Sequence, residues 1–427
     1  MTQWRDRFGS VHIEHEPVRN LAEPPMVRVV GPIETAWADR TQRSSLRSAV
    51  LAQPNPIIER DPEQPDEALW SWVVAAADAA AVLLWTNPVF DHADVSTAEM
   101  TRLEDSDLWT ICLRLPAAMR ASYRICVWRS EETPPWRSVR GRRPVLLAAG
   151  DASEVDPRGS ECVRASVGVV SSVGVGPDAP RCLAAGSDAS GAHTTPITLP
   201  SGHRAWVYAP PRVDALPTPL VLLFDGQVWE AMGLADAVDA AIARGELPAL
   251  HLALLDSGDS EARWAGLGVP GAYVDVVLDE LLPFVRSTYN VDPRAEATII
   301  AGQSLGGVAA LWALALGGDE IGHAIAQSPS LWRFAVAEPL LANAAWHSIT
   351  LQAGTFEPDM LVSADALRAV LTGDSRAIGR SVTFEAFDAG HDWAAWRSNL
   401  LNGLRSMFRS PTTQQFNAEV CRLGDVK

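Results

Sequence analysis

The chain has 427 residues, of which 47% are hydrophobic and 20% charged, and its formal net charge is −17 at pH 7. Such a composition is typical of globular proteins, and the length favours two domains over one. The acidic balance argues against nucleic acid as a partner, because phosphate binding needs clustered Lys and Arg, and it equally disfavours an anionic membrane surface.

The amino-terminal stretch and the cysteines indicate the cellular compartment. The first residues, MTQWRDRFGSVHIEHE, contain no apolar core of a signal peptide, and no apolar run reaches the roughly 18 residues that span a bilayer. The five cysteines are an odd number without a C-x-x-C pair, which indicates neither a disulfide framework nor a zinc site. We therefore expect a cytoplasmic protein.

The first part of the chain is predicted to be rich in β-strands. Short runs of β-branched and aromatic residues at 80–87, 107–115 and 121–129 are bounded by charged or turn-forming clusters. They favour a β-sandwich domain over residues 1–150. A stretch rich in Gly, Pro, Ser and Ala follows without sustained periodicity, and residues 151–195 are interpreted as a connector.

Residues 196–427 are predicted to alternate strands and helices. The apolar runs expected as strands lie at residues 203–210, 219–226, 249–256, 297–304, 323–330, 347–354 and 381–387. The helices expected among and after them lie at residues 232–244, 273–289, 305–316, 363–371 and 393–408. Nearly continuous apolar strands separated by helices predict an α/β fold, with a mostly parallel sheet covered on both faces. Reactive groups in such sheets gather at the carboxyl ends of the strands.

The strand expected at residues 297–304 ends in a candidate nucleophile. Residues 302–306, GQSLG, form a G-x-S-x-G pentapeptide that lies directly between a predicted strand and a predicted helix. The glycines let the chain turn sharply at a strained serine, and the first amides of the helix suit a developing oxyanion. This context predicts that Ser304 is a nucleophile rather than a small packing residue.

A serine hydroxyl needs a base, and His391 stands in the expected place. It follows the last predicted strand at its carboxyl end, whereas four other histidines open strands at the opposite edge. In α/β-hydrolases the acid lies between the serine and the histidine along the chain, so the loop after residues 347–354 should carry it. Glu357 is the predicted acid, and Asp359 is the alternative.

The oxyanion hole is predicted from backbone amides. One donor is the amide of Leu305, which directly follows the nucleophile. The other should come from the loop after residues 219–226, from the amide of Gln227 or of Gly226.

Substrate contacts are expected from Arg263, Trp229 and Trp393, which fall in loops that should rim the site. Aromatic walls there would suit a planar aromatic substrate. No lysine-bearing phosphate loop, no G-x-G-x-x-G after a strand and no workable second His/Asp pair is present. We therefore expect neither a cofactor nor a metal.

Three elements of the second half, DGQVW, AGQSLGG and GHDWAAWR, are specific when they occur together. With VLLWTN and DLWTICLRL of the first half, they resemble the enterochelin (enterobactin) esterase family, within the esterase-D-like hydrolases. The resemblance implies an α/β-hydrolase preceded by a smaller β-sandwich, and hydrolysis of the ester bonds of a tri-catecholate siderophore to release iron inside the cell. It places the nucleophile, base and acid on Ser304, His391 and Glu357. It implies no catalytic metal, because the iron arrives with the substrate.

Two loops depart from the pattern of that family. Gly266 and Pro270 stand where the family carries polar residues, and Phe356 stands where an arginine usually precedes the acid. These positions are expected to handle the charged catecholates of the substrate. Their replacement leaves the reaction class intact and bears on which ester is cleaved.

Two other functions fit the same residues. One is a different esterase-D-like carboxylesterase or acyltransferase, acting on an ester that is not a siderophore. The other is a hydrolase-fold protein that only binds its ligand, although the intact Ser, Glu and His set argues against it. The expected partner is a small-molecule ester, with a ferric siderophore as the first candidate, and neither nucleic acid nor a membrane. The sequence makes no prediction of the oligomeric state.

Overall fold

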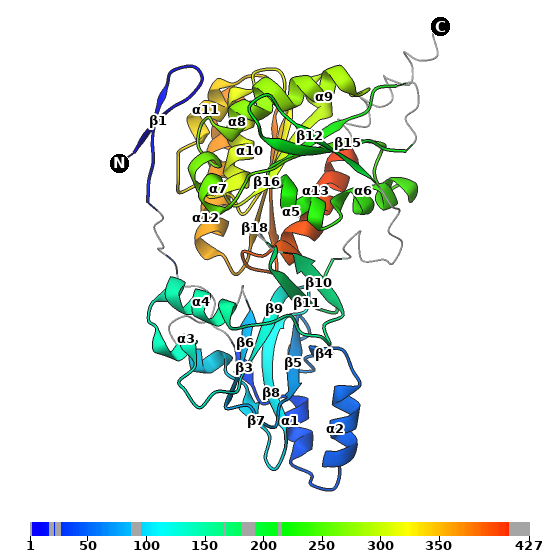
Figure 1. Ribbon diagram of the computed structural model, residues 1–427. Coiled ribbons are helices and arrows are strands. Elements are labelled where there is room, and N and C mark those ends of the chain that lie inside the picture. The colour runs from blue at the N-terminus through cyan, green and yellow to red at the C-terminus, as the bar shows by residue number, and fades with distance from the viewer. Residues whose placement is uncertain are drawn as a thin grey trace. The chain divides into compact units, whose positions relative to one another are not determined.

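The chain divides into two compact units in this computed structural model (Figure 1). The structure describes residues 2–16, 21, 27–86, 95–164, 168–180, 193–211 and 216–409. The first unit, here the α/β unit, comprises Met1–Ala22, Arg181–Phe387 and Trp396–Lys427. The second, here the β-sandwich unit, comprises Glu23–Pro180 and Asp388–Ala395.

The α/β unit is built on an eight-stranded sheet with the strand order β12-β13-β15-β14-β16-β17-β18-β19. The strands β12 and β13 pair antiparallel to their neighbours, and the six strands from β15 to β19 in this order run parallel. In chain order the strands are β12 (Thr194–Thr198), β13 (Arg204–Tyr208), β14 (Leu220–Leu223), β15 (His251–Leu255), β16 (Thr298–Gln303), β17 (His323–Gln327), β18 (Ser348–Gly354) and β19 (Ser381–Phe387).

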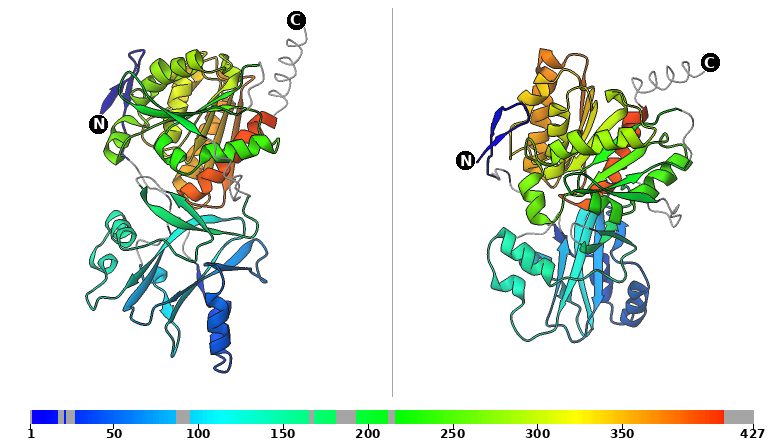
Figure 2. Two further views of the ribbon diagram at one scale, coloured as in Figure 1. Left: turned by 45° about the vertical axis from the view of Figure 1, so that its right-hand side comes forward. Right: turned by 45° about the horizontal axis from the view of Figure 1, so that its top comes forward.

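Helices cover both faces of this sheet (Figure 2). They are α5 (Gly226–Ala231), α6 (Leu234–Ala243), α7 (Ser260–Gly266), α8 (Tyr273–Val276), η3 (Val277–Leu281), α9 (Leu282–Thr288), η4 (Ala295–Ala297), α10 (Leu305–Leu316), α11 (Ala337–Ala342), α12 (Pro358–Gly373), η5 (Ser375–Ala377) and α13 (Trp393–Arg409). Every residue of β14, β16 and α10 is buried, as expected for the centre of a doubly covered parallel sheet.

The elements predicted from the sequence are confirmed in this unit. The seven predicted strands correspond to β13 through β19, and the predicted helix at residues 305–316 coincides with α10. The predicted helix at residues 273–289 is the continuous run of α8, η3 and α9. The short helices α5, α7 and α11 were not predicted, because six or seven residues are too few to show a helical period. Among the described helices, none combines the length and the apolar character needed to cross a bilayer.

The β-sandwich unit contains two antiparallel sheets, ordered β10-β11-β9-β6 and β3-β8-β5-β4, with β7 paired to β8. Its strands are β3 (Arg28–Val29), β4 (Ile57–Arg60), β5 (Glu67–Ala75), β6 (Ala81–Thr86), β7 (Thr101–Arg102), β8 (Leu108–Pro116), β9 (Arg120–Trp128), β10 (Glu161–Arg164) and β11 (Val170–Val175). Its helices are α1 (Pro32–Trp37), α2 (Arg43–Leu51), η1 (Val95–Ala98), α3 (Pro135–Ser138) and α4 (Arg142–Asp151). The sheets meet through buried aromatic side chains, with the rings of Trp72 and Tyr123 centred 5.6 Å apart.

The structure departs from the expected boundaries 1–150, 151–195 and 196–427 in two places besides the segment Asp388–Ala395, which is counted with the β-sandwich unit. The expected connector holds β10 and β11, which extend the sheet at β9, while its residues 181–192 lie outside the described part of the chain. Periodicity missed these strands because small and polar residues make up most of ECVR and VSSVGV.

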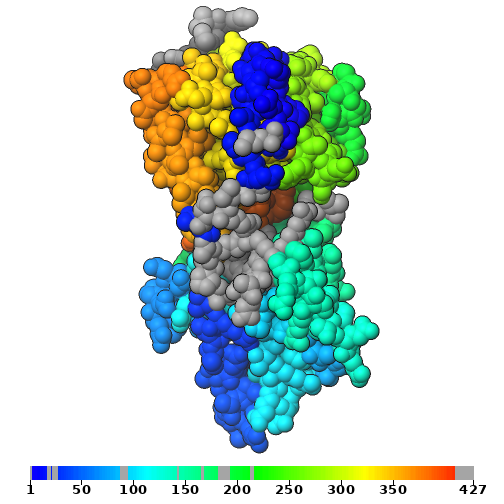
Figure 3. All heavy atoms as spheres, turned by 90° about the vertical axis from the view of Figure 1, so that its left-hand side faces the viewer, coloured from blue at the N-terminus to red at the C-terminus, as the bar shows by residue number. Residues whose placement is uncertain are grey.

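The second departure is the amino-terminal hairpin, which belongs to the α/β unit. It consists of β1 (Gln3–Arg5) and β2 (Val11–Ile13) and lies on the surface of that unit (Figure 3). The ring of His12 meets the ring of Trp312 edge-on at 4.8 Å.

Just beyond the hairpin, Glu14 neutralises a buried arginine. The side chain of Arg333 is 4% exposed, and its Nη2 lies 2.8 Å from Oε1 of Glu14. Its Nη1 donates to the carbonyl oxygen of Leu267 at 2.7 Å. The amide of His15 donates to the carbonyl oxygen of Arg333 at 2.9 Å. The first residues of the chain therefore complete the fold of the α/β unit.

We predict that His251 makes the protein sensitive to acid. Its Nδ1 lies 2.7 Å from Oγ1 of Thr218, and burial lowers the pKa of the imidazole from 6.5 to about 4. The unfolded chain therefore binds a proton that the folded chain rejects, and the free energy of unfolding falls as the pH drops from 6.5 towards 4. The loss is up to about 1.4 kcal/mol for each pH unit.

The measurement is the urea midpoint at pH 7 and at pH 5. His251→Asn should show a smaller acid shift than the wild type, because His323, whose pKa is also lowered to about 4, remains in both proteins. His193→Asn, at an exposed position, is the control and should keep the wild-type shift. An equal shift in all three proteins would contradict the prediction.

Candidate functional site

Ser304 occupies a strained turn between β16 and α10. Its backbone angles are φ 57° and ψ −119°, a conformation that costs a residue with a side chain about 1–3 kcal/mol. Its amide donates to the carbonyl oxygen of Gln327 at 2.9 Å, and its carbonyl oxygen accepts from the amide of Ser330 at 3.0 Å. The neighbouring strand and loop thus hold the serine in the conformation of a nucleophile elbow.

The glycines around Ser304 are required by close backbone packing. A Cβ on Gly302 would lie 2.2 Å from the carbonyl oxygen of Gly306, the second residue of α10. A Cβ on Gly306 would lie 3.3 Å from Oδ2 of Asp225. Leu305, whose amide is the predicted oxyanion donor, is the first residue of α10, and the first amides of a helix have no acceptor within it.

Glu357 is a buried carboxylate in the loop between β18 and α12. Its side chain is well shielded from solvent, with the residue 8% exposed. Its Oε2 accepts hydrogen bonds from Oγ of Ser328 at 2.6 Å and from the amide of Gly354 at 3.0 Å. Asp359, the alternative acid, is half-buried in the first turn of α12, and its Oδ1 accepts from the amide of Leu21 at 3.2 Å.

Ser328 binds the carboxylate of Glu357, and the sequence did not predict this contact. It directly follows β17, has a positive φ of 41°, and is fully buried. Its hydroxyl donates to Glu357 and accepts from Nε1 of Trp396 at 3.0 Å. Its place at the carboxyl end of a strand was the available signal. Since Gln327 binds the amide of Ser304, one stretch of chain connects the serine with the buried carboxylate.

His391 lies four residues beyond the end of β19 and is half-buried. It belongs to the segment Asp388–Ala395, which is counted with the β-sandwich unit. Its neighbour Asp392 anchors this turn. Oδ2 of Asp392 accepts from the amide of Ser122 in β9 at 2.6 Å, and Oδ1 accepts from the amide of Ala394 at 3.0 Å. Burial raises the pKa of the Asp392 carboxyl above its usual value.

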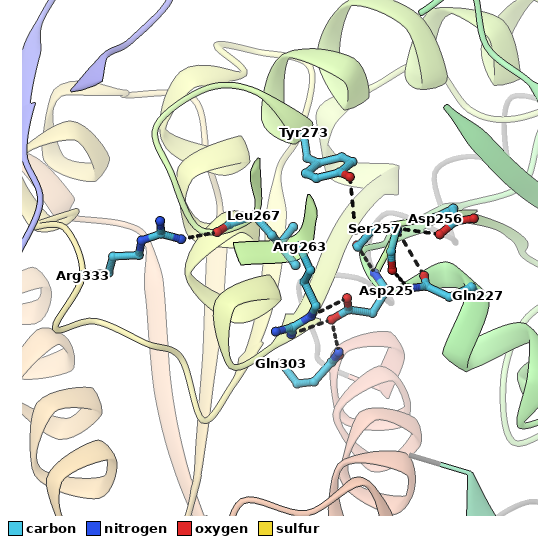
Figure 4. Close-up of polar contacts among 10 residues, drawn as sticks. Asp225, Gln227, Asp256, Ser257, Arg263, Leu267, Tyr273, Gln303 and Arg333 are labelled. Carbon is cyan, nitrogen blue, oxygen red and sulfur yellow. Dashed lines mark hydrogen bonds and ion pairs between the residues drawn. The ribbon is translucent and has the colours of Figure 1, made fainter. Parts of the chain in front are cut away.

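Arg263 and Gln227 belong to a polar cluster at the ends of β14, β15 and β16 (Figure 4). The guanidinium of Arg263 binds both carboxylate oxygens of Asp225, with distances of 2.8 Å from Nε and from Nη2. Nε2 of Gln227 donates to the carbonyl oxygen of Gly258 at 3.0 Å, and its Oε1 accepts from the amide of Ser257 at 3.1 Å.

The two tryptophans expected at the substrate lie in different surroundings. Trp229, in α5, is fully buried, and its ring has no exposed surface to offer a ligand. Trp393, the first residue of α13, is half-buried and adjoins the turn that carries His391.

The departure at Gly266 has a packing reason. A Cβ at this position would lie 2.6 Å from Cε2 of Tyr273, because the tyrosine ring covers the glycine. The hydroxyl of Tyr273 in turn donates to the carbonyl oxygen of Ser257 at 3.1 Å. An aromatic ring therefore lies over the end of α7, where a larger residue at position 266 would not fit.

Two family models match the chain. The model described as "Putative esterase" matches residues 198–407, and the model described as "Enterochelin esterase, N-terminal" matches residues 69–184. The two matches follow one another in the order of the units, which is the order predicted from the sequence.

Several relatives match across most of the chain. The iron(III) enterobactin esterase of Escherichia coli O6:H1 is 27% identical over 380 residues, which cover 82% of this chain and 90% of the relative. The iron(III) salmochelin esterase of the same organism is 27% identical over 359 residues, covering 76% and 83%. The enterobactin esterase of Shigella flexneri, solved in the presence of enterobactin, has a TM-score of 0.71 at 24% identity and covers 85% of this chain and 98% of its own. This structural likeness confirms the predicted fold.

We predict that Gly302→Ala destabilises the α/β unit. The added methyl group would overlap backbone at Gly306 rather than a flexible side chain, so the elbow or α10 must shift. Overpacking of this kind costs about 1–3 kcal/mol, and a lower midpoint of thermal unfolding measures it. The control is Gly373→Ala at the end of α12, where no atom lies within 4 Å of the new methyl group. Equal midpoints for the two variants would refute the packing argument.

Proposed function

This chain belongs to the enterochelin esterase family, and from this membership we propose that it hydrolyses the ester bonds of a catecholate, enterobactin-like siderophore and so releases its iron in the cytoplasm. The protein is an esterase. The siderophore substrate is supported by the names of the relatives, which act on iron(III) enterobactin and iron(III) salmochelin. The observation that carries the reaction is the strained turn at Ser304, because a serine held at φ 57° between a strand and a helix has the backbone of a hydrolase nucleophile.

In the proposed mechanism, Ser304 attacks the ester carbonyl while His391 takes the hydroxyl proton. Glu357 stabilises the imidazolium that forms, and the amides of Leu305 and Gln227 donate hydrogen bonds to the tetrahedral oxyanion. His391 then returns the proton to the departing alcohol, which leaves an acyl group on Ser304. A water molecule, deprotonated by the same histidine, hydrolyses that intermediate and restores the serine.

The burial pattern supports Glu357 as the acid in this mechanism. A carboxylate shielded from water stabilises an imidazolium more strongly than one in solvent, because the local dielectric constant is lower. Glu357 is 8% exposed and already held by Ser328 and Gly354. Asp359 is the more exposed of the two and binds the amide of Leu21.

The residues expected to contact the substrate differ in burial and in their partners. Trp393 is half-buried, and we assign it to the catechol ring of the substrate. Trp229 is fully buried and Arg263 is bound to Asp225, so they enter the proposal as supports of the neighbouring loops.

A second candidate function is the hydrolysis or transfer of a different acyl group by the same residues. The observation in its favour is the loop with Gly266, where Tyr273 packs against the glycine in place of the polar residues typical of the family. Such a loop offers a charged catecholate fewer hydrogen bonds. A role limited to ligand binding has no observation of its own in its favour.

The substrate is tested by turnover of ferric enterobactin, a linear catechol ester and p-nitrophenyl acetate. We expect all three to be cleaved, and Ser304→Ala should lower kcat by at least about 10⁴-fold because the nucleophile is lost. Cleavage of p-nitrophenyl acetate alone would reject the siderophore and leave the second candidate function. A Ser304→Ala enzyme with full activity would reject the serine mechanism itself.

The acid is tested by comparing two isosteric variants. Glu357→Gln should lower kcat about 10³- to 10⁴-fold, because the amide can no longer stabilise the imidazolium. Asp359→Asn should stay within threefold of the wild type. Both variants are measured with p-nitrophenyl acetate after circular dichroism has shown native folding. The reverse pattern would assign the acid to Asp359.

A further inference from the structure

Asp225 lies two residues beyond β14 and has a buried carboxylate and a strained backbone. It is 1% exposed, and its backbone has the left-handed angles φ 57° and ψ 37°, which residues other than glycine rarely adopt. Its amide donates to Oγ of Ser257 at 2.8 Å, and its carbonyl oxygen accepts from the amide of Val228 at 2.9 Å. Strain of this kind persists where surrounding contacts over-determine the conformation, and it concentrates at functional sites.

The carboxylate of Asp225 joins the ends of two other elements (Figure 4). Arg263 of α7 binds both oxygens, and Nε2 of Gln303, the last residue of β16, donates to Oδ2 at 2.5 Å. Gln303 is fully buried. In Figure 4 the side chains of Arg263 and Gln303 approach Asp225 from separate segments.

Through Gln303 the carboxylate reaches the nucleophile turn. Gln303 directly precedes Ser304. The hydrogen bond of its side chain to Asp225 therefore helps to hold the backbone just before the serine. The Cα of Gly306 also packs near Asp225, because a methyl group there would lie 3.3 Å from Oδ2. Gln303 and Gly306, on either side of the serine in the sequence, are therefore both packed against the carboxylate of Asp225.

Through its own backbone Asp225 also sets the loop that bears the second oxyanion donor. Gln227 is two residues further on, and its side chain is fixed between the backbone of Ser257 and that of Gly258. Gly226 packs so closely on β15 that a Cβ would lie 2.3 Å from the carbonyl carbon of Leu254. The loop therefore has little freedom once Asp225 is held.

We propose that Asp225 is a positioning residue that sets the distance between the nucleophile at Ser304 and the oxyanion donor at Gln227, with Arg263 as its counter-charge. The inference rests on the function proposed above, since it presumes that Ser304 and Gln227 act in acyl transfer. It gives Arg263 a role in the chemical step for every ester, independent of any charge on the substrate. A contact between Arg263 and the substrate would instead matter only for anionic esters.

The test is steady-state kinetics with p-nitrophenyl acetate, a small ester without charge. Asp225→Asn should lower kcat about 100-fold and leave KM within threefold, because a small misplacement of oxyanion donors affects the transition state more than the bound substrate. Gln303→Met, close in size to the native side chain, removes only the bond to Oδ2 and should lower kcat about tenfold. Arg263→Gln should lower kcat on this ester as well.

The matched control is Asp292→Asn, which breaks a comparable pair. Asp292 is 7% exposed, and Nη2 of Arg294 lies 2.6 Å from its Oδ2, but the pair precedes β16 at the opposite edge of the sheet. It should keep wild-type kinetics. Circular dichroism and the thermal midpoint establish that each variant is folded, and if Asp225→Asn does not fold, Gln303→Met decides.

Two results would overturn the inference. The first is a folded Gln303→Met or Asp225→Asn enzyme with wild-type kcat on p-nitrophenyl acetate. The second is an Arg263→Gln enzyme with a raised KM for ferric enterobactin and unchanged kinetics on the neutral ester. This result would show that Arg263 contacts the substrate. Failure of the proposed function is distinguishable, because hydrolysis would then survive Ser304→Ala in the wild-type background.

Discussion

The α/β unit depends on one abrupt turn of the backbone, at Ser304, where β16 becomes α10. The turn demands glycine at position 302, since the carbonyl oxygen of Gly306 occupies the place of a side chain there. It is held from the side by Gln327 and Ser330, and from behind by a helix whose residues are all buried. Strain of about 1–3 kcal/mol is tolerated because the surrounding packing leaves the serine no other conformation.

The parallel sheet explains why buried polar side chains gather at one of its edges. Neighbouring strands in the order β15-β14-β16-β17-β18 each deliver a polar side chain within three residues of their carboxyl ends. These side chains are Ser257, Asp225, Gln303, Ser328 and Glu357. All of them are buried, and buried polar groups are costly unless they are hydrogen-bonded. Their hydrogen bonds to one another therefore make the site a rigid part of the fold rather than an addition to it.

The sequence was most informative where local chemistry is sufficient. An apolar strand, a glycine and an apolar helix predicted the Ser304 turn and the bounds of α10, because that geometry depends on adjacent residues. The sequence favoured Glu357 over Asp359 by chain order alone, and the difference in their burial could not be read from two carboxylates so close in sequence. The partner of Arg263 could not be foreseen, since Asp225 lies 38 residues away and any exposed loop could have held the arginine. The strands β10 and β11 were not predicted, because small and polar residues carry little strand signal. Pairing with β9 and with each other places these residues in a sheet.

The ion pair between Glu14 and Arg333 spans 319 positions of the chain, and residues 23–180 of the β-sandwich unit lie between its two partners in the sequence. Glu14 is synthesised before residues 23–180 of the β-sandwich unit and before most strands of the large sheet. It can pair with Arg333 only after these segments have been made. A fragment that starts after the β-sandwich would leave that guanidinium buried without its carboxylate, at a cost of about 3–5 kcal/mol. In the order of the sequence, the smaller unit is a long insertion, Glu23–Pro180, and a short one, Asp388–Ala395, in the chain of the larger unit.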